Sequence, residues 1–314
     1  MRTADTLRRD GARTLQAAGV ESAGHDAAEL LAHVLDVEPG RLLLVDEVSD
    51  ADTARFNTAL DRRAAREPLQ HITGRAWFDG IELAVGPGVF VPRPESELIA
   101  EWVSSLRVST PLDQRLGTPL DQRLGTPQGA PLRVADLCSG SGALALAIAR
   151  RLPDAEVTAV EISDTAVEYL RRNAAGTDVT VLAGDVTDLA AMAQALGTCD
   201  VIVANPPYVP AASPVSAEVR HDPAEAVFSG DTGMDVIAAM IPIVADALAP
   251  GGHFAVEHDD ETSAAVVDAL TADGRFHTVV AHTDLADRPR FVTAVRSGGN
   301  VGAADHSDRA RMEP

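Results

Sequence analysis

The sequence predicts an α/β fold: a doubly wound, seven-stranded sheet with its last strand antiparallel, preceded by a small N-terminal helical domain. The first observation behind this prediction is the alternation, from Arg133 to Val295, of short apolar segments with segments of helical periodicity. The second is that Val201–Ala204 carries no polar residue, which is typical of a strand buried on both faces. The third is the length of 314 residues, which accommodates one large domain and one small one.

Residues 1–75 are predicted to form the N-terminal helical domain, which we expect to recognise the substrate. Apolar residues recur there at helical spacing over three stretches. Asp26 and either Asp50 or Asp52 are the expected N-caps. Pro68 is expected to end the third helix.

Residues 76–94 are expected to form a β-hairpin and a connector. The two strands, Ala76–Phe78 and Ile81–Val85, flank the turn sequence Asp79-Gly80. Prolines on both sides of Arg93 favour an extended backbone. A helix from Glu95 to Leu106 then opens the larger domain, residues 95–297.

The larger domain is expected to contain seven strands joined mostly by helices. The strand candidates are Arg133–Leu137, Glu156–Val160, Val179–Leu182, Val201–Ala204, His253–Glu257, Thr278–His282 and Phe291–Val295. The helix candidates are Ala143–Leu152, Ala166–Ala174, Leu189–Leu196, Met234–Leu248 and Thr262–Thr271. Because no helix separates the last two strands, we expect them to pair in antiparallel orientation.

Two segments are expected to lie outside the packed fold. The sequence Thr-Pro-Leu-Asp-Gln-Arg-Leu-Gly occurs twice in tandem, at 110–117 and 118–125, which indicates an insertion in a surface loop spanning 110–130. The tail, residues 298–314, is rich in Gly, Ala and Asp and is predicted to be disordered.

Composition disfavours several classes of protein. The net charge of −21 would repel a polyanion and attract a basic partner, so we expect no direct contact with nucleic acid. No apolar run reaches the roughly 18 residues of a membrane span, and the N-terminus lacks the apolar segment of a signal peptide. Two cysteines, Cys138 and Cys199, cannot build a disulfide framework, so we expect a cytoplasmic protein. We further expect it to be a monomer.

A glycine-rich segment, Asp136–Gly142, follows the first strand of the sheet and begins a helix, so its backbone can approach a ligand closely. Glu161 ends the second strand, where a carboxylate can accept hydrogen bonds from both hydroxyls of a ribose. Asp185, after the third strand, could receive an adenine amino group or serve as a turn residue. A methyl donor and a dinucleotide both fit, because Gly140-x-Gly142-x-x-Ala145 with a distal acid also satisfies the dinucleotide fingerprint.

The fourth strand ends in Asn205-Pro206-Pro207-Tyr208, the most informative motif in the chain. The first and fourth strands should be neighbours at the switch point of the sheet, so this motif is expected to face the glycine-rich segment. The Asn205 side-chain oxygen and the Pro206 carbonyl can accept both hydrogens of a planar –NH2 group, and Tyr208 can stack on it. Two acceptors raise the electron density on this weakly nucleophilic nitrogen, so the motif predicts its methylation.

These motifs resemble those of class I S-adenosylmethionine-dependent methyltransferases and, more narrowly, of the release-factor glutamine N5-methyltransferases. The resemblance spans about Glu67 to Arg296 and includes the helical region before it. Its further segments are Glu67–Gly74, Phe90–Glu97 and Asp284–Arg290. Two positions depart from the family pattern: Cys138 stands where glycine is usual, and Val186 stands where some members place an aromatic residue against adenine.

The resemblance implies transfer of a methyl group from S-adenosylmethionine, without a metal, to the side-chain amide nitrogen (N5) of a glutamine in the GGQ loop of peptide chain release factors. The donor-binding residues that it implies are Asp136, Cys138, Ser139, Gly140, Ser141, Gly142, Glu161, Asp185, Val186 and Asn205. The substrate-binding residues that it implies are Arg93, Asn205, Pro206, Pro207 and Tyr208, of which Asn205, Pro206 and Tyr208 would be catalytic.

Other interpretations stay open at this point. The same four-residue motif occurs in enzymes that methylate N6 of adenine in DNA or N2 of guanine in ribosomal RNA. Such enzymes normally carry a basic groove, and base flipping needs side chains to fill the vacated stack, whereas aromatic residues make up only 4% of this chain. An NAD-type binding module would leave Asn205–Tyr208 without a role. A ribosomal protein in place of a release factor is a close variant of the glutamine hypothesis.

Overall fold

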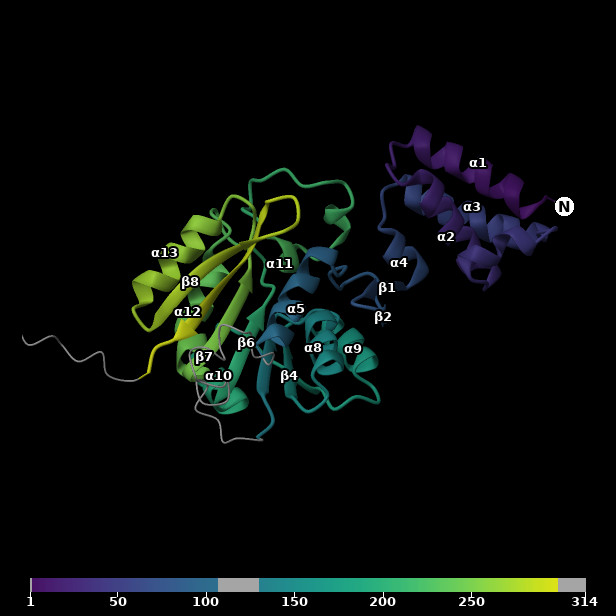
Figure 1. Cartoon of the computed structure of the whole chain (residues 1–314). Helices are drawn as coiled ribbons and strands as arrows, with labels where there is room; N and C mark the ends of the chain where they lie inside the picture. The colour runs from purple at the N-terminus through teal and green to yellow at the C-terminus, as the bar shows by residue number, and fades with distance from the viewer. Residues whose placement is uncertain (1, 107–129, 299–314) are drawn as a thin grey trace, which may run out of the picture.

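The structure, a computed structural model, describes residues 2–106 and 130–298. An N-terminal bundle of helices lies at one end, a larger α/β domain at the other, and a short hairpin between them (Figure 1). The tandem repeat at 110–125 and the tail from residue 299 lie outside the described residues.

The N-terminal bundle encloses an apolar core of its own. Its elements are α1 (Ala4–Ala17), α2 (Ala23–Leu35), the 3₁₀ helix η1 (Pro39–Leu44), α3 (Asp50–Ala64) and α4 (Leu69–Thr73). Leu15, Leu31 and Phe56 come from different helices and are almost fully buried together. The helical periodicity of apolar residues therefore explains how these helices pack.

The expected N-caps of the bundle are wrong, because Ser22 and Ser49 hold those places. Helix α2 begins after Ser22, so Asp26 lies inside the helix, where it is buried and accepts a hydrogen bond from Arg63 Nε at 2.7 Å. Helix α3 begins after Ser49, whose Oγ accepts from the Asp52 N–H at 3.0 Å. Asp26 thus stabilises the packing of α2 against α3 instead of capping a helix, as was expected.

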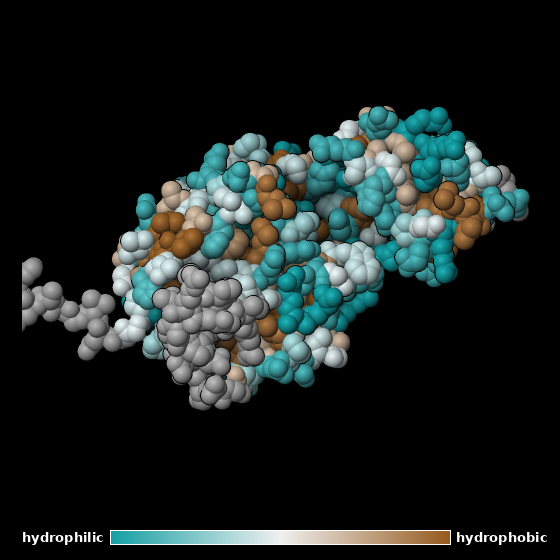
Figure 2. Space-filling model, in the orientation of Figure 1, coloured by the Kyte–Doolittle hydropathy of each residue, from teal (hydrophilic) through white to brown (hydrophobic). Residues whose placement is uncertain are grey.

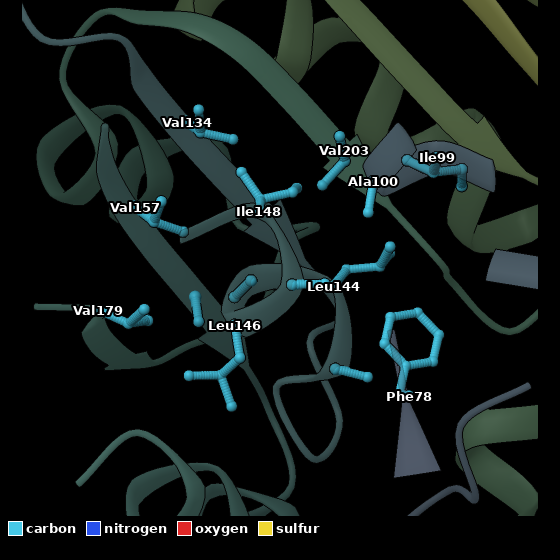
Figure 3. Close-up of a cluster of buried hydrophobic side chains, with 14 of the residues drawn as sticks. Phe78, Ile99, Ala100, Val134, Leu144, Leu146, Ile148, Val157, Val179 and Val203 are labelled. Carbon is cyan, nitrogen blue, oxygen red and sulfur yellow. The ribbon is translucent and has the colours of Figure 1, made fainter. Parts of the chain in front are cut away.

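The hairpin has the predicted form. Strands β1 (Arg75–Phe78) and β2 (Ile81–Ala84) pair antiparallel, and Asp79 and Gly80 both have positive φ, as a tight two-residue turn requires. Phe78 points into the core of the α/β domain, beside Leu144 (Figure 3). The hairpin is therefore packed on the larger domain.

The larger domain contains the seven-stranded sheet, with strand order β5-β4-β3-β6-β7-β9-β8. The strands are β3 (Arg133–Leu137), β4 (Glu156–Glu161), β5 (Thr180–Ala183), β6 (Cys199–Ala204), β7 (Leu248–Glu257), β8 (Phe276–Thr283) and β9 (Pro289–Arg296). All neighbouring pairs are parallel except those made by β9, which runs antiparallel to both β7 and β8. This confirms the predicted fold class, and β3 and β6 meet at its switch point.

Helices cover both faces of the sheet. The 3₁₀ helix η2 (Pro94–Ser96) leads into α5 (Glu97–Ser105), and the remaining elements are α8 (Ala143–Arg151), α9 (Asp164–Asn173), α10 (Leu189–Leu196), η3 (Val219–His221), α11 (Ala224–Val227), α12 (Asp235–Ala247) and α13 (Ser263–Asp273). Helices α5, α8 and α9 pack on one face, and α10, α12 and α13 on the other. Successive residues of β3, such as Val134 and Ala135, belong to opposite cores, which explains the continuously apolar strands.

Most predicted element boundaries lie within two residues of the observed ones. The main difference is β7, which begins at Leu248, before the sequence Ala-Pro-Gly-Gly that reads as a turn. A register irregularity between Cys199 and Val201 accommodates this segment beside β6. Among the described residues, none of the helices has the length and apolar character needed to cross a membrane.

Candidate active site

A cavity of about 440 Å³ opens at the carboxyl edge of the sheet, where β3, β4, β5 and β6 end. The predicted site residues that line it are Arg93, Asp136, Cys138, Ser139, Gly140, Ser141, Glu161, Asp185, Val186, Asn205, Pro207 and Tyr208. Gly142 and Pro206 are absent from its lining, although both lie next to residues that belong to it. The glycine-rich segment and the Asn-Pro-Pro-Tyr motif therefore face one cavity, as the topology predicts.

The two glycines of the loop are required for different reasons. Gly140 has φ +55°, and a Cβ placed on it would meet no atom within 4 Å, so its backbone borders open space. Gly142 has φ +88°, and a Cβ there would lie 2.5 Å from Leu170 Cδ1. Gly140 therefore admits a ligand, whereas Gly142 lets α8 begin in close contact with α9.

Cys138 occupies a backbone conformation that normally favours glycine, with φ +60°. This conformation is a physical reason for the glycine that the resemblance leads one to expect at this position. Burial, with the nearby carboxylates of Glu161 and Asp136, raises the pKa of the Cys138 thiol well above its usual range. The thiol is therefore neutral, and it suits a small apolar lining group better than a nucleophile.

Two buried polar atoms beneath the loop lack a protein partner. Asp136 accepts a hydrogen bond from the Ala145 N–H at 3.1 Å through Oδ2, while its Oδ1 has no partner, and neither has Ser141 Oγ. Burial raises the pKa of Asp136 to about 7. Buried polar atoms are usually paired, so these two suit a polar ligand bound in the cavity.

Glu161 is anchored by the backbone of two loops. Its Oε2 accepts from the Gly140 N–H at 2.8 Å, and its Oε1 accepts from the N–H groups of Ile162 and Ser163 at 2.9 and 2.8 Å. Each carboxylate oxygen offers about two acceptor sites. Oε2 therefore retains capacity for one more donor, whereas the prediction assigned this carboxylate to two ribose hydroxyls.

The residues after β5 divide between the surface and the core. Asp185 is exposed, and its Oδ1 accepts from the Thr187 N–H at 2.8 Å, so it forms the expected turn while also bordering the cavity. Val186 is buried and belongs to the core under the sheet. An aliphatic side chain therefore covers the position where an aromatic ring was considered.

Two residues that the sequence did not single out connect the Asn-Pro-Pro-Tyr motif to the core. Asn205 Nδ2 donates to Ser96 Oγ at 3.1 Å, and Ser96 Oγ donates to Glu257 Oε2 at 2.5 Å. Tyr208 OH donates to Glu257 Oε1 at 3.0 Å. Glu257 ends β7, the strand next to β6. A charged residue at the end of this buried strand is the sequence feature by which it could have been predicted.

The electrostatics of this group follow from its burial. Glu257 is 4% exposed, and burial raises its pKa to about 7 against the lowering effect of the hydrogen bonds from Ser96 and Tyr208. Burial beside this carboxylate also raises the pKa of Tyr208 well above its usual range. Tyr208 is therefore a neutral hydrogen-bond donor, and it belongs to the lining of the cavity.

Arg93 borders the cavity but is already engaged by the protein. Its Nη2 donates to Asp222 Oδ2 at 2.7 Å, and its guanidinium lies 4.9 Å from the centre of the Phe90 ring. Asp222 also accepts from the Val91 N–H at 3.3 Å. Arg93 thus ties the connector to the segment that follows the Asn-Pro-Pro-Tyr motif.

A second contact joins this segment to the N-terminal bundle. Glu218 accepts hydrogen bonds from Arg63 Nη2 at 3.1 Å and Arg66 Nη2 at 2.7 Å, and both arginines belong to the end of the bundle's third helix and the turn after it. Arg63 also binds the buried Asp26. The N-terminal bundle supplies none of the cavity lining, but it holds a segment that does. Across residues 2–106 and 130–298, no cluster of three His, Cys, Asp or Glu side chains could hold a metal ion.

The strand order, the glycine-rich loop after the first strand of the sheet and the motif at the switch point define a class I methyltransferase. Residues 6–74 match the model of the PrmC N-terminal domain, and residues 120–222 match that of the methyltransferase small domain. The chain belongs to the release factor glutamine methyltransferase family, as the motifs indicated.

Three members of this family illustrate the similarity. The release factor glutamine methyltransferase of Mycolicibacterium smegmatis is 46% identical, over 90% of this chain and 94% of its own length. That of Mycobacterium tuberculosis (strain H37Rv) is 42% identical, over 95% of both chains. That of Streptomyces coelicolor is 41% identical, over 88% of this chain and 92% of its own.

Proposed function

We propose that this enzyme transfers a methyl group from S-adenosylmethionine to the side-chain amide nitrogen of a glutamine in a peptide chain release factor. The observation that carries the proposal is the position of Asn205, whose Nδ2 is held by Ser96 at the edge of the cavity. Its amide oxygen is thereby left as an acceptor for a substrate –NH2 group. The names of the relatives supply the release factor.

The donor side of the cavity suits S-adenosylmethionine. When bound, this molecule supplies an electrophilic methyl group on a sulfonium sulfur. The unpaired oxygens of Asp136 and Ser141 suit its polar amino-acid portion, and the remaining acceptor site of Glu161 suits one ribose hydroxyl. The open backbone at Gly140 gives it room. No metal is needed, because the leaving group already carries a positive charge.

The substrate side needs acceptors more than a base. Asn205 and the Pro206 carbonyl would hold both amide hydrogens and raise the electron density on nitrogen. The nitrogen lone pair forms the new N–C bond while the methyl–sulfur bond breaks, and the electron pair of the broken bond stays on sulfur, which leaves as a neutral thioether. One N–H proton then leaves to solvent. The proton becomes acidic only after alkylation, so positioning supplies much of the rate, with effective molarities of up to ~10⁵–10⁸ M.

Charge favours a protein substrate over free nucleic acid. The visible surface is mainly hydrophilic, with apolar residues in separate patches (Figure 2), and the chain carries a net charge of −21. A basic protein that itself binds RNA would be attracted to this negative charge, whereas free nucleic acid, a polyanion, would be repelled by it.

The N-terminal bundle is the part that we assign to substrate recognition. We divide the chain near residue 75, because the bundle core ends at Ile72, while side chains from Ala76 onward pack into the larger domain. The hairpin and connector, which follow the bundle directly, supply lining residues of the cavity, and Glu218 links the bundle to a segment that also lines it. A protein loop entering the cavity would pass this junction.

The proposal is tested by incubating the protein and labelled S-adenosylmethionine with a purified release factor, free DNA and free RNA in separate reactions. We expect label in the release factor alone, with an initial rate that falls as salt rises, because steering by charge is screened. Label in DNA or RNA at a comparable rate would contradict the proposal. Calorimetry with NAD is the control for the donor, and tight binding of NAD without binding of S-adenosylmethionine would contradict it as well.

A further inference from the structure

We propose that Glu257 is a positioning residue, which acts through Ser96 to hold Asn205 with its amide oxygen toward the substrate. This inference rests on the proposed function, in which that oxygen receives an amide hydrogen of the glutamine. Glu257 itself is absent from the lining of the cavity, whereas Ser96, Asn205 and Tyr208 belong to it. Its influence on the reaction must therefore pass through these neighbours.

The direction of the hydrogen bonds follows from the number of protons available. An ionised carboxylate only accepts hydrogen bonds, so Ser96 must give its single hydroxyl proton to Glu257. Ser96 Oγ can then only accept from Asn205, which must turn its –NH2 group toward Ser96. The amide oxygen of Asn205 is left facing away, as an acceptor.

Protonation of Glu257 removes this constraint. A neutral carboxylic acid can donate to Ser96, and the Ser96 hydroxyl can then donate to Asn205 Oδ1. The Asn205 amide could then turn over and present its –NH2 group to the substrate, where it would repel the amide hydrogens. The ionised form of Glu257 thus selects the orientation that binds a glutamine.

The groups around Glu257 allow both states near neutral pH. Ser96 from η2 and Tyr208 from the segment after β6 donate to it. Of the charged groups, Glu95 on η2 opposes its ionisation and Arg290 on β9 favours it. Burial dominates and raises the pKa of Glu257 to about 7, so ionisation is lost as the pH falls through this value. We therefore expect an acid limb near pH 7 in the rate of methyl transfer.

The experiment compares single-turnover methylation of a release factor at saturating S-adenosylmethionine, from pH 6 to 9, in the wild type, Glu257→Gln, Ser96→Ala and the double variant. We expect Glu257→Gln to lose at least tenfold in rate at pH 8.5, to retain donor affinity, and to lose the acid limb. Because Glu257 acts through Ser96, the double variant should be no slower than Ser96→Ala alone.

Glu95→Gln provides a matched variant that leaves the network intact. Removing this like charge should lower the pKa of Glu257 and move the acid limb to lower pH, with the rate at pH 8.5 unchanged. A merely structural role for Glu257 would not move the limb.

The inference is overturned if Glu257→Gln keeps the wild-type pH profile, if the losses in the double variant multiply, or if Glu95→Gln leaves the limb in place. Should Glu257→Gln not fold, Ser96→Ala and Glu95→Gln still decide the question. If the wild type transfers no methyl group to glutamine at any pH, the proposed function itself is wrong.

Discussion

Residues of the glycine-rich segment, Asp136–Gly142, show that a sequence motif can identify a site without revealing what each of its residues does. The sequence does not distinguish the roles of Gly140 and Gly142. In the structure Gly140 borders the cavity, whereas Gly142 packs closely against Leu170. Asn205 could be predicted because amide and proline residues end a buried strand. Ser96 and Glu257 could not, because their importance arises from contacts across 109 and 161 residues of chain.

We predict that Gly142→Ala lowers stability while Gly140→Ala does not do so to the same degree. The new methyl group at Gly142 would overlap Leu170 in a backbone conformation that L-residues disfavour, at a cost of about 1–3 kcal/mol. Gly140→Ala meets no atom and should weaken donor binding instead. Urea unfolding and calorimetry with S-adenosylmethionine measure the two effects, and equal losses of stability would contradict the assignment.

The two buried carboxyl groups predict how stability depends on pH. Burial raises the pKa of Asp136 and that of Glu257 to about 7, whereas unfolded Asp and Glu titrate near 3.9 and 4.3. Between these values the folded state holds protons that the unfolded state has lost, so stability falls as pH rises from about 4 to about 7 and then levels off. Each group contributes at most about 4 kcal/mol to this fall.

Glu257→Gln should remove one of these contributions. The variant is expected to match the wild type in stability at pH 5 and to exceed it at pH 8, since an uncharged amide avoids the desolvation of a carboxylate. Thermal unfolding at both pH values measures the difference. A variant that is less stable than the wild type by the same amount at both values would show that Glu257 does not titrate in this range.

At the scale of elements, periodicity predicted the strands and helices of the larger domain well because its sheet is buried on both faces. Apolar strands and amphipathic helices then have distinct patterns. The prediction was weaker at the ends of helices and strands, because single hydrogen bonds decide at which residue an element begins. Ser22 and Ser49, rather than the aspartates after them, precede α2 and α3. The start of β7 was missed because Leu248 pairs with Cys199 ahead of a Pro-Gly-Gly segment, and the regular register with β6 begins only after it, at His253.

We predict that one copy of the duplicated sequence at 110–125 is dispensable. Deleting Thr118–Gly125 removes one copy between α5, which ends at Ser105, and β3, which begins at Arg133. Halving a loop changes its closure free energy by only about 0.6 kcal/mol. We therefore expect unfolding midpoint and methylation rate close to those of the wild type. Loss of folding or of activity would show that the second copy has a structural part in the enzyme.

At the scale of the whole molecule, the bundle and the larger domain are joined through the segment that follows Asn205–Tyr208. Glu218 binds Arg63 and Arg66 of the bundle, and Asp222 binds Arg93 of the connector. The sequence predicted two domains but not this junction, because charged residues give no pattern that identifies a partner far along the chain. The position of the bundle is thereby coupled to the wall of the cavity.

Glu218→Ala should loosen this junction without altering the chemistry. The Glu218 carboxylate is partly exposed, so losing its two arginine contacts should weaken the junction by about 1–2 kcal/mol of free energy. Arg63 keeps its hydrogen bond to Asp26. We expect a higher KM for the release factor with kcat and donor affinity unchanged. Asp231→Ala, at an exposed carboxylate of the same segment, is the matched control. Equal KM values for the two variants would argue against a role of the junction in substrate binding.

The proposed reaction depends on the amide oxygen of Asn205, and the most direct measurement is methylation by Asn205→Ala with the modified residue mapped by mass spectrometry. For the wild type we predict one methyl group on the side-chain nitrogen of a release factor glutamine. For the variant we predict a loss in kcat equivalent to about 2.7–4 kcal/mol, by analogy with removing one preorganised partner of a transition state, while S-adenosylmethionine binding persists. Wild-type turnover by Asn205→Ala, or a methyl group mapped to any residue other than glutamine, would contradict the account.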